Sequence, residues 1–295
     1  MAPTASELGY LARRAVVTAG PVVARHYLEQ RDLTVRGAQG VTLGVIAAYV
    51  VGIAILWNVP YLKYILWPFK VRSRVQQPYP ANGTDGLNQM LVIAFHEFGH
   101  ASTACCTGGR VESISLDPHE GGVTHMRGGV SAITLPTGYL GSSLIGALLT
   151  FCGFNTVASK VASIVLGVCF LLVLWWGKKD WLTILTILIA VGIIIGFWFV
   201  PEALRFYVLF IGVMSSLYSV WDICDDLVLR KVNSSDASQF AKRYGGSSQC
   251  WGIIWSLISC TIMAAGIVAG IAAFPQTSAQ QENDSDGFIP TGQRF

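Results

Sequence analysis

Charged side chains are scarce in this chain. Only 13% of its 295 residues are Asp, Glu, Lys or Arg, whereas a soluble globular domain has about a quarter. The formal net charge is +3, and the basic residues flank apolar runs without forming a continuous stripe. This composition argues against a soluble domain and against a nucleic-acid partner.

Two further features are missing. The seven cysteines have no paired CxxC spacing and lie mostly in or beside apolar segments, so the sequence predicts no disulfide framework. Residues 1–40 lack the apolar core of a cleaved signal peptide. This basic segment is therefore predicted to be an N-terminal arm, in the cytosol or on the membrane surface.

Long apolar runs are abundant, and hydrophobic residues make up 53% of the chain. A bilayer core takes roughly 20 apolar residues as a helix. The sequence predicts an α-helical polytopic membrane protein with about seven spans (six to eight), whose transmembrane domain covers 41–274. The polar residues 275–295 are predicted to be a disordered tail. The predicted spans are 41–57, 87–106, 136–154, 157–176, 181–200, 201–226 and 251–274.

Loop charges predict an orientation for this multi-pass, integral membrane chain. If every run crosses once, Lys178, Lys179 and the basic residues of 230–243 lie on the same side as the N-terminal arm. The acidic tail then lies on the other side. Because basic loops are retained in the cytosol, the N-terminus is predicted to be cytosolic.

The segment His96-Glu97-Phe98-Gly99-His100 lies inside one of these apolar runs. Histidines four residues apart project from one face of a helix, which is the spacing that a single Zn²⁺ needs. Glu97 can accept a proton from a metal-bound water. Imidazole and carboxylate groups are costly in hydrocarbon, so the sequence predicts a hydrolase with one zinc per chain, whose catalytic residue is Glu97.

A catalytic zinc takes three protein ligands and keeps one position open for water. In the run 201–226, Ser215, Ser219, Asp222 and Asp226 are spaced by four, three and four residues, so they share one helical face. A polar face in an apolar span points inward. Asp222 is the predicted third ligand because it is expected at the depth of the histidines, and Asp226 and Asp225 are the alternatives.

The stretch 107–135 is rich in glycine. The alternation from Val111 to Ile114 and the paired glycines predict a strand–turn–strand unit, which is a small membrane-associated β-hairpin after the motif helix. His119 and His125 lie in this polar stretch. They are further candidate ligands, but they would be mobile there without support.

Together these motifs resemble the site-2 protease family of intramembrane zinc metalloproteases, in particular a divergent branch found in bacteria, plants and fungi. The resemblance rests on the HEFGH block, the glycine-containing segments 108–116 and 120–124, and the small residues of 138–146. It implies a zinc metalloendopeptidase that cleaves membrane protein substrates in or near their transmembrane segments. It also implies that Gly121, Gly122 and Val123 contact an unwound substrate as a strand edge.

One departure from the family pattern concerns the third ligand. The family commonly supplies this ligand from an Asn-Pro…Leu-Asp-Gly segment, and this sequence has no such string. Other classes of function therefore remain open. They are a catalytically inactive membrane protein that binds zinc or clients, an ion or solute transporter, and another zinc hydrolase acting on lipids or prenylated peptides.

Overall fold

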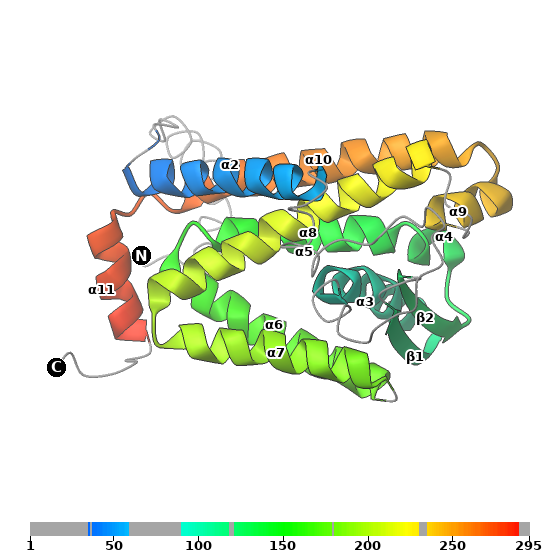
Figure 1. Ribbon diagram of the computed structural model, residues 1–295, viewed down its shortest axis with the longest axis horizontal. Coiled ribbons are helices and arrows are strands. Elements are labelled where there is room, and N and C mark those ends of the chain that lie inside the picture. The colour runs from blue at the N-terminus through cyan, green and yellow to red at the C-terminus, as the bar shows by residue number, and fades with distance from the viewer. Residues whose placement is uncertain are drawn as a thin grey trace, which may run out of the picture. The chain divides into compact units, whose positions relative to one another are not determined.

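The computed structural model describes residues 35, 37–58, 90–117, 121–178, 180–229 and 235–288. Some side chains within these ranges, including those of 222 and 224–229, are outside the description. The predicted N-terminal arm lies almost wholly outside the described residues. The described chain is mostly helical and has one small sheet (Figure 1).

Every predicted apolar run forms a helix. Four of these helices, α2, α6, α8 and α10, are long and apolar enough to cross a membrane, whereas α5 and α7 contribute shorter apolar stretches. The prediction of a helical membrane protein is therefore confirmed, and the number of crossings stays a prediction. The helices are α2 (Gly37–Asn58), α3 (Met90–Cys106), α5 (Thr137–Cys152), α6 (Thr156–Gly177), α7 (Trp181–Trp198), α8 (Pro201–Leu229) and α10 (Ser248–Ala273).

Large apolar side chains cover much of the outward surface of these helices. Leu171 on α6 is 66% exposed, Ile195 on α7 is 58% exposed and Leu257 on α10 is 64% exposed. A water-soluble protein rarely leaves so many large apolar groups in contact with solvent. Helices that face lipid need such a surface, because polar side chains are costly in hydrocarbon. Their polar backbone groups are already satisfied within the helix.

Helix α5 packs against α3, α8 and α10. Its contact with α8 depends on glycine, because a Cβ on Gly146 would lie 2.7 Å from the carbonyl oxygen of Gly212. Ser142 and Ser219 join the two helices through their hydroxyls, 2.6 Å apart. Ser215 and Ser219 are fully buried. The small residues of α5 and the serine face of α8 therefore point inward, as the sequence predicts.

Strands β1 (Arg110–Asp117) and β2 (Gly121–Arg127) form an antiparallel pair with Leu116 opposite Gly122. The predicted hairpin is thus confirmed. Ile114 and Leu116 are each 1% exposed and belong to the main hydrophobic core. Asp180, between α6 and α7, accepts a hydrogen bond of 3.0 Å from the backbone N–H of Leu116. The pair therefore lies fixed across α3, with β1 attached to the α6–α7 connection.

The start of α2 lies beside the end of α10, because the Gln39 side chain donates hydrogen bonds of 2.8 Å to the carbonyls of Ile271 and Phe274. If every run crossed once, these two helix ends would lie on opposite sides of the membrane, so the predicted placement of the acidic tail opposite the N-terminal arm is wrong. A single run that does not cross reverses the relation between the ends. The cytosolic N-terminus stays a prediction.

The polar tail was expected to be disordered, yet Ser278–Phe288 forms a helix, α11. Gln281, 2% exposed, donates to the carbonyl of Phe154 and accepts from Arg205. Lys160, fully buried on α6, donates to the carbonyl of Ser285 over 3.0 Å. Polar contacts hold this helix in place. A prediction of order from apolar content alone therefore misses it.

Candidate metal centre

Helix α3 presents His96 and His100 toward the start of α5. The two helices touch backbone to backbone, because Gly99 lies directly against the carbonyl of Thr137 and a Cβ there would overlap it. A glycine between the two histidines thus lets α5 approach the face that carries them. Phe95 stacks on Phe170 of α6 at 5.9 Å between ring centroids, which fixes α3 in the main core just before the motif.

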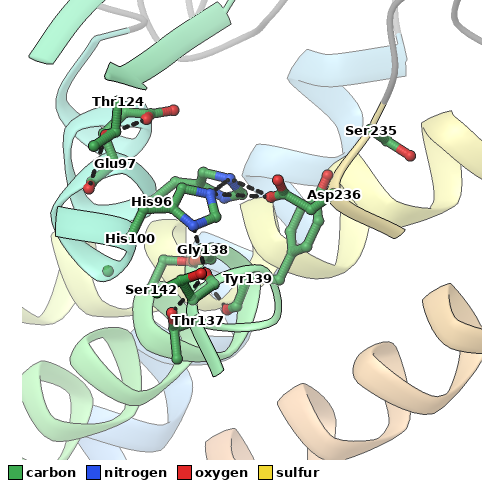
Figure 2. Close-up of polar contacts among 12 residues, drawn as sticks. His96, Glu97, His100, Thr124, Thr137, Gly138, Tyr139, Ser142, Ser235 and Asp236 are labelled. Carbon is green, nitrogen blue, oxygen red and sulfur yellow. Dashed lines mark hydrogen bonds and ion pairs between the residues drawn. The ribbon is translucent and has the colours of Figure 1, made fainter. Parts of the chain in front are cut away.

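Three donor atoms converge at this point. The Nε2 atoms of His96 and His100 lie 3.1 Å apart, and Asp236 Oδ2 lies 3.0 Å from the first and 3.1 Å from the second (Figure 2). In a tetrahedral site with Zn–N distances near 2.0–2.1 Å, neighbouring donors are roughly 3.3 Å apart. Within the described part of the chain, this is the one group of three His, Cys, Asp or Glu side chains able to hold a metal ion.

The surroundings orient each imidazole. His100 Nδ1 lies 2.7 Å from the carbonyl oxygen of Thr134, so this nitrogen carries the proton and donates it. In the neutral ring the lone pair is then on Nε2, the atom that faces the other two donors. The His96 ring meets the ring of Tyr139 edge to face, with centroids 4.6 Å apart. Tyr139 is 3% exposed, so His96 is held by a buried aromatic contact.

Gly138 leaves the room that a metal ion needs. A Cβ at this position would overlap the Nε2 atoms of both His96 and His100. Glycine at the second residue of α5 therefore keeps the space beside the donor atoms free of side chain. The convergence of two imidazole nitrogens and a carboxylate, with this space beside them, fits Zn²⁺.

Asp236 is the first residue of a short helix, α9 (Asp236–Tyr244). Ser235 caps this helix by accepting a 3.2 Å hydrogen bond from the backbone N–H of Ser238, which fixes the direction of the first turn. Phe240, 8% exposed, packs on Trp251 and Trp255 with centroids 4.7 and 5.5 Å apart. Helix α9 is thereby attached to an aromatic cluster, separate from the main core, formed by Tyr139, Ile223, Ala237, Phe240 and Trp255.

The electrostatic surroundings keep Asp236 ionised. Burial by itself would raise the pKa of this carboxyl. The adjacent His100 and His96 counteract burial through charge and hydrogen bonding, and together they hold the pKa of Asp236 well below its usual range. A carboxylate that stays deprotonated at neutral pH is the form that binds a metal.

Glu97 lies beneath the hairpin, with its side chain close to β2. It is 4% exposed, and its Oε2 accepts a 2.6 Å hydrogen bond from the hydroxyl of Thr124. A Cβ on Gly122 would overlap the Glu97 carboxyl group. Glycine at this position of β2 therefore lets the backbone of the strand lie directly on the carboxylate.

The structure brings the predicted His96 and His100 together. The side chains of Asp222, Asp225 and Asp226 in α8 lie outside the described residues, so the prediction of Asp222 as the third ligand stays a prediction. His119 is likewise outside the description. The other alternative, His125, is exposed on β2 and does not belong to the donor group.

Asp236 is not among the ligand candidates that the sequence suggests. Those candidates are acidic residues on the apolar run 201–226 and histidines of the polar stretch 107–135, whereas Asp236 lies ten residues beyond the end of that run. A usable signal was present, because Ser235-Asp236 has the composition of a helix start and Ala237, Phe240 and Tyr244 repeat with helical spacing. A short amphipathic helix between two spans was therefore predictable.

Comparison with protein families gives one match, to the family described as Peptidase M50B-like, over residues 45–266. This range contains α3, the hairpin, α5, α8 and α9, and thus every residue of the donor group. No curated protein and no solved structure matches the chain. Because the family match covers most of the sequence, the chain belongs to the M50B-like peptidases, the site-2 protease-like family that its motifs resemble.

Proposed function

We propose that this protein is an intramembrane zinc metalloprotease that hydrolyses peptide bonds in or near transmembrane segments of membrane proteins. The observation that carries this proposal is the convergence of His96, His100 and Asp236 donor atoms at 3.0–3.1 Å from one another. Membership of a peptidase family supports the reaction class. The apolar outward surface supports placement of the helices in the bilayer. We expect about seven helical segments that cross the bilayer or re-enter it from the same side.

We assign the third ligand to Asp236 in place of Asp222. The Asp236 carboxylate is already within hydrogen-bond distance of both Nε2 atoms, and its low pKa gives it the charge state of a ligand. Its position at the start of α9 also explains why the chain lacks the Asn-Pro…Leu-Asp-Gly segment. The ligand comes from a helix after the span and not from the span itself.

Glu97 is suited to act as the general base. Zinc held by His96, His100 and Asp236 would lower the pKa of a bound water toward about 7. Thr124 donates to Oε2 of Glu97 and so fixes the carboxylate, which leaves Oε1 able to accept a proton from that water. The same oxygen then returns the proton to the leaving amine of the cleaved peptide. Burial under β2 keeps bulk water away from this exchange.

The hairpin offers a surface for an unwound substrate. The Leu116 N–H points to Asp180 and away from β2, so Leu116 and Gly122 are a non-hydrogen-bonded pair of the antiparallel ladder. In such a pair the N–H and C=O groups of each residue point away from the partner strand. Gly122 and Thr124 therefore present N–H and C=O groups along the outer edge of β2, beside Glu97. A transmembrane helix must unwind before cleavage, and an extended segment can pair with such an edge.

The test of the reaction is Glu97→Gln in the purified full-length protein, with Glu112→Gln, an exposed glutamate on β1, as the matched control. We expect Glu97→Gln to keep one zinc per chain and to lose cleavage of a transmembrane reporter by at least about 100-fold. The control should match the wild type in both measurements. Cleavage at the wild-type rate by Glu97→Gln would favour an inactive zinc-binding protein or a transporter.

A further inference from the structure

The two ends of α9 have different surroundings. Its first residue, Asp236, belongs to the donor group, whereas its last turn carries Lys242 and Arg243, both exposed. On one side of the helix Ala237 and Phe240 are buried in the aromatic cluster. The helix is therefore amphipathic, and it connects a ligand of the metal centre to a basic surface.

Aromatic residues accompany this basic surface. Tyr244, at the end of α9, is 46% exposed. Trp251, at the start of α10, donates its indole N–H to the carbonyl of Gly245 over 2.9 Å. Tyrosine and tryptophan concentrate at the boundary between hydrocarbon and water, and lysine and arginine reach from there to lipid headgroups. The composition of the α9–α10 corner is that of a helix lying at a membrane surface.

Exposed positive charge gathers at this end of the protein. Figure 1 shows α9, α4 (Ser131–Thr134) and the hairpin at one end of the helices and α11 at the other. Among the described side chains, the exposed cations of the hairpin, of the end of α6 and of α9 are Arg110, Arg127, Lys178, Lys242 and Arg243, and the exposed acid Glu112 is paired with Arg127. At the other end, Glu202, Glu282, Asp284 and Asp286 are exposed, and Lys160 and Arg205 are buried.

The basic end of α9 is also connected to the histidines. Arg243 donates a hydrogen bond to the hydroxyl of Ser131 at the start of α4. At the end of α4, the carbonyl of Thr134 accepts the hydrogen bond that orients His100. A displacement of the last turn of α9 therefore acts on the metal centre at two points, through Asp236 directly and through α4.

We propose that Lys242 and Arg243 bind the headgroups of anionic phospholipids, and that this contact holds α9 in the position where Asp236 completes the metal centre. The inference rests on the proposed zinc site. Its physical basis is charge complementarity, because a membrane leaflet rich in anionic lipid attracts basic residues at its surface. The zinc affinity of the protein then depends on the lipid composition around it.

The experiment uses the full-length protein in nanodiscs of phosphatidylcholine alone or with one third phosphatidylserine. The zinc dissociation constant is measured by competition with a chelator, and the backbone amide exchange of residues 236–244 is measured separately. We expect zinc binding about tenfold tighter and slower α9 exchange in the anionic discs, given the attraction of two basic residues to the surface. The variant Lys242→Gln/Arg243→Gln should lose both differences.

Three controls separate lipid binding from other causes. Arg110→Gln/Lys178→Gln removes two exposed cations from the same end but not from α9, and it should respond to phosphatidylserine like the wild type. Ser131→Ala removes the hydrogen bond of Arg243 and keeps its charge, so it should keep the part of the lipid response that acts through Asp236. Inorganic phosphate added to neutral discs should not replace phosphatidylserine.

Several outcomes would overturn the inference. They are equal zinc affinity and equal α9 exchange in the two kinds of disc, a lipid response that survives in Lys242→Gln/Arg243→Gln, or full replacement of the lipid by phosphate. Failure of the zinc site itself would look different. The wild type would then bind no zinc in either disc, while amide exchange of α9 would still report whether the lipid holds the helix.

Discussion

The two halves of the proposed metal centre are held by different means. His96 and His100 come from α3, which lies between α5 and the hairpin and touches the backbone of α5 at Gly99. Asp236 comes from a nine-residue helix attached mainly through Phe240 to a separate aromatic cluster. Local stability differs between such units. The histidine half is therefore expected to be preformed, and the aspartate half to be the part that adjusts.

The largest expected effect is on the histidine half. Gly138→Ala should abolish zinc binding, with a loss of affinity greater than about 100-fold, because the added methyl group would overlap both Nε2 atoms. Gly167→Ala on α6, where a Cβ meets nothing within 4 Å, is the matched control and should bind one zinc. Stoichiometric zinc in purified Gly138→Ala, measured by metal analysis, would show that the ion lies elsewhere.

The next effect distinguishes the two aspartates assigned to the third position. Asp236→Asn removes the charge next to both imidazoles and should weaken zinc binding by roughly 100-fold, while His96 and His100 keep a weak residual site. Asp222→Asn should bind zinc like the wild type. Chelator competition measures both constants. The reverse result, with zinc lost only in the Asp222 variant, would return the ligand to α8.

A smaller effect is expected where α9 is attached. Phe240→Ala removes a buried aromatic ring at a cost of about 3–5 kcal/mol in packing, and most of this cost falls on the contact between α9 and the aromatic cluster. Zinc affinity should fall about tenfold, and the amides of α9 should exchange faster. Trp181→Ala, at an exposed ring on α7, should change neither. An unchanged zinc affinity in Phe240→Ala would mean that α9 needs no aromatic anchor.

The sequence predicts that His96 and His100 lie together, for a physical reason. Their spacing is set by the helix itself, and the cost of polar groups in an apolar run favours a functional role for them. The inward serine face of α8 and the hairpin follow from equally local rules. In each case the residues that form the pattern lie in one short stretch of the chain, so local spacing is enough to predict the face or turn that they form.

The aspartate half and α11 could not be found in the same way. Asp236 meets the histidines across 140 residues of chain, and its position is decided by packing of Phe240 on Trp251 and Trp255. Helix α11 is held by hydrogen bonds from Arg205 and Lys160. A hydropathy scale scores both of these residues as unfavourable for burial in an apolar helix bundle. The position of Asp236 and the placement of α11 both depend on contacts between residues far apart in the sequence, which are polar or lie in short segments. The local spacing of apolar residues does not predict such contacts.

The smallest expected effect separates binding of the metal from its use. Thr124→Val keeps the shape of the side chain but removes the hydroxyl that donates to Glu97, so the carboxylate loses one charge-assisted hydrogen bond, worth about 1.5–3 kcal/mol. Zinc affinity should be unchanged, because the donor group is untouched, while cleavage of a transmembrane reporter should fall roughly tenfold. Thr261→Val on α10, whose hydroxyl bonds only within its own helix, should cleave normally. A loss of zinc in Thr124→Val would show that the hairpin also supports the histidines, so that metal binding and catalysis would depend on the same support.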